Sequence, residues 1–359
     1  MFRQSFVFAL LLVAQSAQLQ AQANTVTRSR RTEVVMDSAR ARELYVSNRH
    51  EDHPQADFRR QLTEKQRTDS IFAARSEGIM RFRKVTYRSS ADSLQIPAYV
   101  FEPLQTRPGQ HAAMVWVHGG VHGNMDQNYL PFIIEAVQRG YVIVTPDYRG
   151  STGHGAAFYN AIDYGGFEVD DAEAAVSVLK QISAVDTTRI GVMGWSHGGF
   201  ITAHLMFRGA KTPFKAGAAI VPVTNLVFRL SYKGPGYQRS FSTQSRLQGL
   251  PFEQQDEYVR RSPYYHVDSL QRPILVHVAT NDRDVNFEES RPLIDALVAR
   301  KPDLAETKIY ENPTPGPVSG GHTFSRRVDR QTLLRDDSPE QVDAWNHIWR
   351  FFEQHLGKQ

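Results

Sequence analysis

From residue 112 onward, short apolar runs alternate with longer segments in which apolar residues recur every three or four positions. The short runs are typical of buried strands, and the longer segments have the period of amphipathic helices. This alternation predicts an α/β protein with a mostly parallel sheet covered by helices on both faces. We expect strands at 112–118, 141–147, 189–195, 215–223, 272–280 and 307–312, and helices at 129–140, 167–182, 199–207, 288–300 and 343–356.

Three stretches depart from this alternation. Residues 80–89 and 94–103 alternate apolar and polar positions, which predicts an antiparallel pair of strands at one edge. Residues 24–79 are polar and charged, and we interpret them as a linker followed by a helical appendage that ends near Gly78. Residues 224–265, rich in Tyr, Phe, Gly and Ser, are too long for a plain connection. We interpret them as a lid-like insertion that faces the substrate, with an irregular surface loop as the alternative.

The first 23 residues have the three-part order of a secretory signal peptide. Arg3 is the charge of the first part, residues 6–14 are the apolar part, and Ala21-Gln22-Ala23 is a small-x-small cleavage site. We therefore expect cleavage after Ala23 and a periplasmic or secreted protein; a buried N-terminal helix is the alternative. Because no later segment approaches 18 apolar residues, we expect no membrane span in the mature chain.

Composition and charge narrow the possible partners. Of the 359 residues, 41% are hydrophobic and 22% charged, as in ordinary globular proteins. The net charge of +4 comes from basic residues interleaved with acidic ones, so no stripe for nucleic acid is predicted. The chain has no cysteine, which excludes disulfides, a thiol nucleophile and a zinc–thiolate site. Oligomeric state cannot be derived from the sequence.

The segment GVMGWSHGGF, residues 191–200, holds Ser196 between a predicted strand and a predicted helix. A serine on such a strand-to-helix turn forms a nucleophile elbow, and the tight turn needs small neighbours, here Gly194 and Gly198. The alternative is a glycine-rich helix start with a capping serine. The segment predicts a nucleophile at Ser196.

A serine nucleophile needs a base, and the base needs an orienting acid. In this architecture the acid and then the base follow later strands in chain order. Asp282 and Asp284 follow the strand predicted at 272–280, and His322 follows the strand predicted at 307–312. We therefore expect His322 as the base, with Asp282 or Asp284 as the acid.

The negative oxygen formed in acyl transfer is normally stabilised by two backbone N–H groups. We expect one from His197, directly after the nucleophile, and the other from Gly119 or Gly120 in the segment HGGVHGN. Four histidines near these motifs raise the question of a metal, but no His-x-x-x-His pattern on a helix supports one. The chemistry predicted here needs no cofactor. The four histidines are His118, His122, His154 and His197.

Five segments together resemble the catalytic domain of the prolyl oligopeptidase family, and its acylaminoacyl-peptidase-like branch in particular. They read VWVHGGVHGN, GYVIVTPDYRGSTGHGAAF, DDAEAAV, RIGVMGWSHGGF and SPYYHVDSLQRPILVHVATNDRDV, and the resemblance covers about residues 80–356. The resemblance implies an α/β-hydrolase fold with Ser196 as nucleophile, His322 as base and Asp282 as acid. The family's acid usually stands three positions before a valine, as Asp282 does before Val285, although Asp284 stays possible.

Other features of the resemblance concern the substrate. Tyr148 and Trp195 are expected to contribute to the wall of the substrate site. Family members often use a tyrosine as oxyanion donor, but HGGVHGN contains none. The family's peptidases usually carry an N-terminal β-propeller that screens substrates by size, and residues 24–79 leave no room for one. From the resemblance and the predicted signal peptide, the chain is expected to be an exported serine hydrolase that cleaves short peptides. The alternatives are a carboxylesterase for acyl, aryl or sugar esters and a noncatalytic binding protein.

Overall fold

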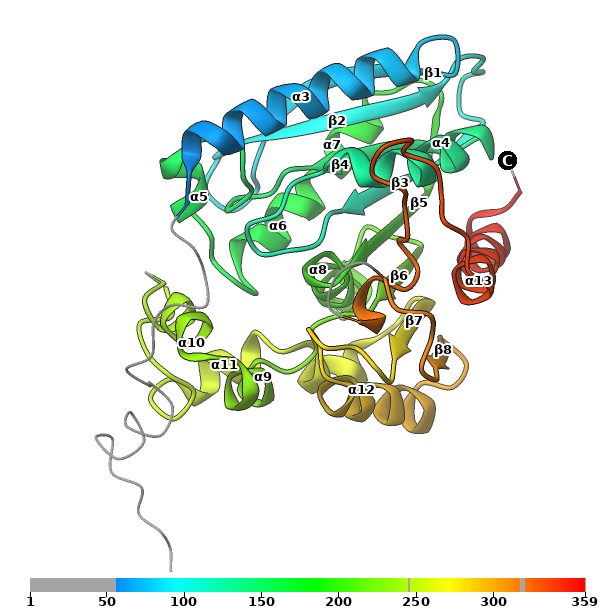
Figure 1. Ribbon diagram of the computed structural model, residues 1–359. Coiled ribbons are helices and arrows are strands. Elements are labelled where there is room, and N and C mark those ends of the chain that lie inside the picture. Colours follow the sequence, from blue (N-terminus) through cyan, green and yellow to red (C-terminus); the bar gives the residue numbers. More distant parts are fainter. Residues whose placement is uncertain (1–55, 245, 317–319, 359) are drawn as a thin grey trace, which may run out of the picture. The chain divides into compact units, whose positions relative to one another are not determined.

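A computed structural model describes residues 56–244, 246–316 and 320–358. The predicted signal peptide and linker lie outside the described residues. A central eight-stranded sheet has the order β1-β2-β4-β3-β5-β6-β7-β8 (Figure 1). β2 runs antiparallel to both β1 and β4, and the remaining neighbours are parallel. The strands are β1 (Met80–Arg88), β2 (Gln95–Pro103), β3 (His111–Val117), β4 (Val142–Pro146), β5 (Val185–Trp195), β6 (Ala216–Ile220), β7 (Ile274–Ala279) and β8 (Ala305–Tyr310).

The helices cover both faces of this sheet, which confirms the predicted α/β-hydrolase class. They are α3 (Phe58–Ser76), α4 (Leu130–Gln138), α5 (Ala156–Asn160), α6 (Phe167–Ala174), α7 (Val176–Lys180), α8 (His197–Met206), α9 (Leu226–Tyr232), α10 (Pro235–Ser242), α11 (Gln255–Arg260), α12 (Phe287–Arg300) and α13 (Pro339–Leu356). Short 3₁₀ turns are η1 (Gln127–Tyr129), η2 (Gly209–Lys211), η3 (Pro263–Ser269) and η4 (Gly321–Thr323). Within residues 56–358 as described, no helix is long and apolar enough to cross a membrane.

Two hydrophobic clusters lie on opposite faces of the sheet. Because successive strand residues point to opposite faces, Val115 joins the cluster under α6, α7, α8 and α12, while its neighbour Trp116 joins the cluster under α3, α4 and α13. Trp116 stacks on Trp195 of β5 with ring centres 5.5 Å apart, and Trp345 of α13 closes this aromatic group. Both faces of the central strands are therefore buried, as their continuous apolar runs require.

Helix α3 lies within the predicted helical appendage and ends at Ser76, close to the predicted end at Gly78. Its first half is so rich in charge that only the end near Phe72 reads as amphipathic, yet the helix begins at Phe58 after a cap by Asp57, whose Oδ1 accepts from the Arg60 N–H at 3.0 Å. Phe72 packs edge-on against aromatic side chains of β2. In the first half, the buried Lys65 pairs with Asp147, so this half also packs against the protein.

Residues between β6 and β7 are largely helical rather than irregular. Helices α9, α10 and α11 and the turn η3 lie in this interval. Figure 1 shows the three helices as a group beyond the carboxyl ends of the central strands. Asn225 caps α9 by accepting from the Phe228 N–H at 3.1 Å. These helices position side chains beside the site described next.

Candidate active site

Ser196 lies on a strained turn between β5 and α8. Its φ of 56° and ψ of −118° fall in a region that non-glycine residues rarely adopt. The turn requires close backbone approaches, because a Cβ on Gly198 would lie 2.2 Å from the Val117 carbonyl oxygen and one on Gly194 would lie 2.5 Å from Gly198. This geometry is that of a nucleophile elbow, with the serine at the positive end of α8.

The structure brings Asp282 and His322 together from the loops after β7 and β8. The Nδ1 atom of His322 lies 2.7 Å from Oδ2 of Asp282, and both side chains are almost fully buried. The other carboxylate oxygen of Asp282 accepts the N–H groups of Asp284 and Val285 at 2.8 and 2.9 Å. Asp282 is thereby held as a partner of Nδ1, the role that an orienting acid plays.

Asp284, the alternative acid, lies on the other side of the imidazole. Its Oδ2 is 3.6 Å from the Nε2 atom of His322, the nitrogen that must face the nucleophile. Burial raises the pKa of Asp284, but the charges of His322, Arg229 and Lys233 outweigh it and hold the pKa well below its usual range. Asp284 is therefore a permanent negative charge at the site, in a position unlike that of an orienting acid.

Ser196 lines two adjoining cavities. One, of about 570 Å³, is also lined by Gly119, Gly120, Tyr129 and His322. The other, of about 450 Å³, is also lined by helices of the insertion and by the start of α3. Ser196, His322 and the expected oxyanion donors thus line two cavities that meet at Ser196.

The expectation that Gly119 donates to the oxyanion is wrong. Its N–H already donates to the Tyr129 hydroxyl at 2.8 Å. Gly119 instead allows a close approach, since a Cβ there would lie 3.0 Å from the Trp195 carbonyl oxygen and 3.4 Å from Cβ of Ser196. The N–H of His197, in the first turn of α8, has no acceptor within its helix, and Gly120 lies on the cavity wall. These two groups remain as candidate donors.

Tyr129 is a site residue that sequence reasoning missed. It comes from η1, beyond the segment HGGVHGN, and lines the cavity with Ser196. Burial raises the pKa of Tyr129, so its hydroxyl stays protonated while its oxygen accepts from Gly119. No local pattern marks this residue, because the contact depends on how the chain turns back after β3.

Tyr148 and Trp195 do not line either cavity that contains Ser196, which overturns their expected role. The alternation of β5 places Trp195 in the core, fully buried, with its Nε1–H donating to Ser325 Oγ at 2.9 Å. Tyr148 is also fully buried and donates its hydroxyl to the Gly120 carbonyl at 2.5 Å. Tyr148 therefore supports the HGGVHGN segment through its hydrogen bond to Gly120.

The histidines near the motifs are held by internal contacts. Nε2 of His118 lies 2.8 Å from Ser151 Oγ, and Nε2 of His154 lies 2.9 Å from Asp147. Burial lowers the pKa of His118 to about 4. His122 stacks on Tyr159 with ring centres 3.7 Å apart. His118 contacts Ser151 and His122 contacts the Gly150 carbonyl, so the DYRGSTGHG segment, residues 147–155, supports the HGGVHGN segment.

His197 faces a buried acid. Its Nε2 lies 3.5 Å from Oε1 of Glu168, and both side chains are buried. Burial raises the pKa of Glu168 to about 8, and burial lowers the pKa of His197 to about 3. Near neutral pH the pair is therefore uncharged, with the proton on Glu168. The Glu168 side chain also accepts the N–H groups of Gly165 and Gly166, at the start of α6.

Residues 128–359 match the model of the prolyl oligopeptidase family, and the chain belongs to this family of serine peptidases. An uncharacterized peptidase of Bacillus subtilis, YuxL, is 27% identical over 272 residues, which cover 75% of this chain and 38% of YuxL. Dipeptidyl aminopeptidase BIII of Pseudoxanthomonas mexicana is 30% identical over 249 residues, 67% of this chain and 33% of that enzyme. The chain therefore spans well under half the length of these relatives.

Solved structures agree on the fold. A puromycin-hydrolyzing peptidase of Mycobacterium tuberculosis superposes with a TM-score of 0.62 at 22% identity, over 78% of this chain and 41% of that one. At this identity the likeness supports the α/β-hydrolase fold, and the activity has to be argued from the site itself.

Proposed function

We propose that the chain is a serine peptidase that cleaves short peptides through an acyl-enzyme. The observation that carries the proposal is the 2.7 Å contact between His322 Nδ1 and Asp282 Oδ2, at the edge of a cavity that also holds Ser196. Family membership supports the same reading. In this proposal Ser196 is the nucleophile, His322 the general base and Asp282 the orienting acid.

The mechanism has two steps. Ser196 Oγ attacks the carbonyl carbon while its proton passes to Nε2 of His322, and the N–H groups of His197 and Gly120 stabilise the negative oxygen. Asp282 keeps the Nδ1–H of the imidazole in place and stabilises the imidazolium. His322 then gives its proton to the leaving amine. Water attacks the acyl-enzyme with His322 again as base, which releases the acid and restores Ser196.

The test compares amide and ester substrates. The purified protein is assayed on aminoacyl anilides and on short acyl aryl esters, with Ser196→Ala as the background. Amide turnover above that background supports a peptidase. Ester turnover without amide turnover identifies a carboxylesterase instead, and the absence of both contradicts the proposal.

Export is a further part of the proposal, and it rests on the sequence of residues 1–23. The charged start, apolar segment and Ala-Gln-Ala site predict a mature chain that begins at Asn24. Expression of the full chain in a bacterial host, followed by fractionation and N-terminal sequencing, tests it. An uncut chain that stays in the cytosol contradicts export.

A further inference from the structure

The two cavities at Ser196 differ in the site residues that line them. In acyl transfer the general base protonates the leaving group, so the leaving group lies on the side of His322. The cavity of about 570 Å³ contains His322 and Thr323. The cavity of about 450 Å³ contains His197, next to the nucleophile, and extends to α9 and α10 of the insertion. The acyl residue therefore points into this second cavity.

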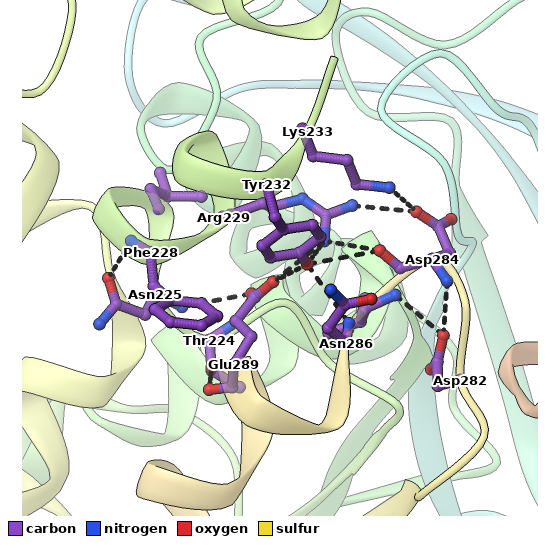
Figure 2. Close-up of polar contacts among 12 residues, drawn as sticks. Thr224, Asn225, Phe228, Arg229, Tyr232, Lys233, Asp282, Asp284, Asn286 and Glu289 are labelled. Atoms are coloured by element: carbon purple, nitrogen blue, oxygen red, sulfur yellow. Dashed lines mark hydrogen bonds and ion pairs between the residues drawn. The ribbon is translucent and has the colours of Figure 1, made fainter. Parts of the chain in front are cut away.

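The wall of the acyl-side cavity is charged. Arg229 and Lys233 of the insertion and Asp284 from the loop after β7 all line it. Figure 2 shows both cations directed at the carboxylate of Asp284. Nη2 of Arg229 lies 3.2 Å from Asp284 Oδ1, and Nζ of Lys233 contacts the same oxygen.

The guanidinium of Arg229 is also held by contacts with side chains other than that of Asp284. Its Nη1 lies 3.2 Å from Oε2 of Glu289, which is fully buried, and its Nε donates to the Tyr237 hydroxyl at 2.7 Å. Glu289 is in turn held by the Thr224 N–H, which donates to Oε1 at 2.8 Å (Figure 2). The guanidinium is thus held by Glu289, which does not line the cavity, and by Tyr237, which does. Its Nη2 edge points toward Asp284. A rigid, buried arginine of this kind suits recognition of a carboxylate.

We propose that this cavity selects an acyl residue with a side-chain carboxylate, as in glutamate or aspartate, bound by Lys233 and Arg229. The inference rests on the proposed peptidase function and names its substrate class. In the free enzyme Asp284 occupies the place of the substrate carboxylate. Its side chain is 35% exposed, whereas that of Arg229 is 4% exposed, so the carboxylate can turn away while the arginine stays.

The charge arrangement disfavours a positively charged acyl residue. The carboxylates that line the cavity are Asp57 and Asp284. Asp57 is engaged as the cap of α3, and Asp284 already has two cations at one oxygen. A substrate ammonium at Asp284 would meet the repulsion of Arg229 and Lys233. A substrate carboxylate meets both cations once Asp284 moves, and burial strengthens such pairs.

The test uses peptidyl anilides that differ only in the acyl residue, with Glu, Gln or Lys at that position. Glu and Gln have nearly the same shape, so the ratio of their kcat/KM values isolates the charge. We expect a Glu-to-Gln ratio of roughly ten or more, as for sites built around a polar group of the substrate. Turnover of Gln equal to or above that of Glu overturns the inference.

Two variants are expected to change the Glu-to-Gln ratio of kcat/KM values in opposite directions. Lys233→Met is expected to lower the Glu-to-Gln ratio several-fold, while Lys180→Met, an exposed lysine of α7, keeps the ratio of the wild type. Asp284→Asn removes the competing carboxylate and is expected to raise the ratio. Because Asp284 also lies near His322, only the ratio is compared and not the absolute rate. Thermal unfolding of each variant checks that it is folded.

Two further outcomes distinguish the preference for an acidic acyl residue from the proposed peptidase activity. Preference for Lys, lost in Asp284→Asn, means that the cavity binds an ammonium group through Asp284, and it overturns the inference while the peptidase proposal stands. If no anilide is cleaved above the Ser196→Ala background, the proposed function fails, and the inference fails with it.

Discussion

Nζ of Lys65 lies 2.5 Å from Oδ2 of Asp147, and both side chains are almost fully buried. This contact joins α3 to the loop after β4. Asp147 also accepts the Met125 N–H at 2.9 Å and contacts His154. One carboxylate therefore joins α3 to the loops that support the HGGVHGN segment.

Lys65→Met is expected to destabilise the protein strongly, because it leaves Asp147 buried without its principal cation. Breaking a buried pair by removing one partner costs about 3–5 kcal/mol. The matched control is Lys84→Met, which removes an exposed lysine from its pair with Asp69 and is expected to cost less than about 1 kcal/mol. Urea unfolding measures both variants, and equal losses would contradict the importance of the Lys65–Asp147 pair.

The pKa of Asp147 predicts how this contribution depends on pH. Burial raises the pKa of Asp147, but the charge of Lys65 and the contacts with His154 and His118 outweigh it and hold the pKa well below its usual range. A carboxyl with a lowered pKa in the folded state contributes stability above its unfolded pKa and loses it as the pH falls. The stability gap between wild type and Lys65→Met should therefore shrink toward strongly acidic pH.

The pKa of Glu168 is shifted in the direction opposite to that of Asp147. Burial raises its pKa from an ordinary value of 4.5 to about 8, so the folded protein keeps a proton that the unfolded chain releases. Stability from this group is present at low pH and is lost as the pH rises between about 5 and 8. The free energy of unfolding of the wild type relative to Glu168→Gln should therefore fall over this interval. Urea unfolding at several pH values measures it, and the exposed Glu311→Gln serves as control. A difference independent of pH would refute the buried neutral carboxyl.

Tyr129→Phe tests whether the tyrosine hydroxyl positions the HGGVHGN segment. The variant removes the hydroxyl that accepts the Gly119 N–H and leaves that donor without its partner. If the hydroxyl positions the loop for the transition state, kcat should fall roughly tenfold while KM changes little. Tyr265→Phe, at an exposed tyrosine, is the matched control. A loss of thermal stability with unchanged kcat would assign Tyr129 a purely structural role.

Asp282→Asn tests which carboxylate orients the base. The substitution keeps the shape of the side chain but favours the wrong tautomer of His322, and kcat is expected to fall by about 10³–10⁴. Asp268→Asn, at an exposed aspartate of η3, is the control. Steady-state kinetics on the best amide substrate measures both. A loss of less than tenfold would shift the role away from Asp282.

The sequence was sufficient to predict the sheet and the residues that stand directly at strand ends. Ser196, Asp282 and His322 each follow a strand with a recognisable apolar pattern, and the carboxyl ends of parallel strands meet at one edge of the sheet. Their proximity therefore follows from topology alone. The spacing to Val285 also favoured Asp282 over Asp284, in agreement with its contact to His322 Nδ1.

Side chains that form the cavity walls could not be predicted in this way. Tyr129, Arg229 and Lys233 come from helices and turns, whose packing directions are not encoded in a local pattern. Trp195 stands next to Ser196 in the sequence, but its side chain is buried in the core and has no access to the substrate. The period of two along β5 places it on the same face as Met193, in the core under α13.

The central claim is that Ser196 is an activated nucleophile in the folded protein. Intact-protein mass spectrometry after treatment with a fluorophosphonate probe tests it most directly, followed by peptide mapping of the adduct. The account predicts a single adduct on Ser196, absent in Ser196→Ala and formed much more slowly in His322→Ala. Failure of the folded wild-type protein to react, or labelling of a different residue, would contradict the account.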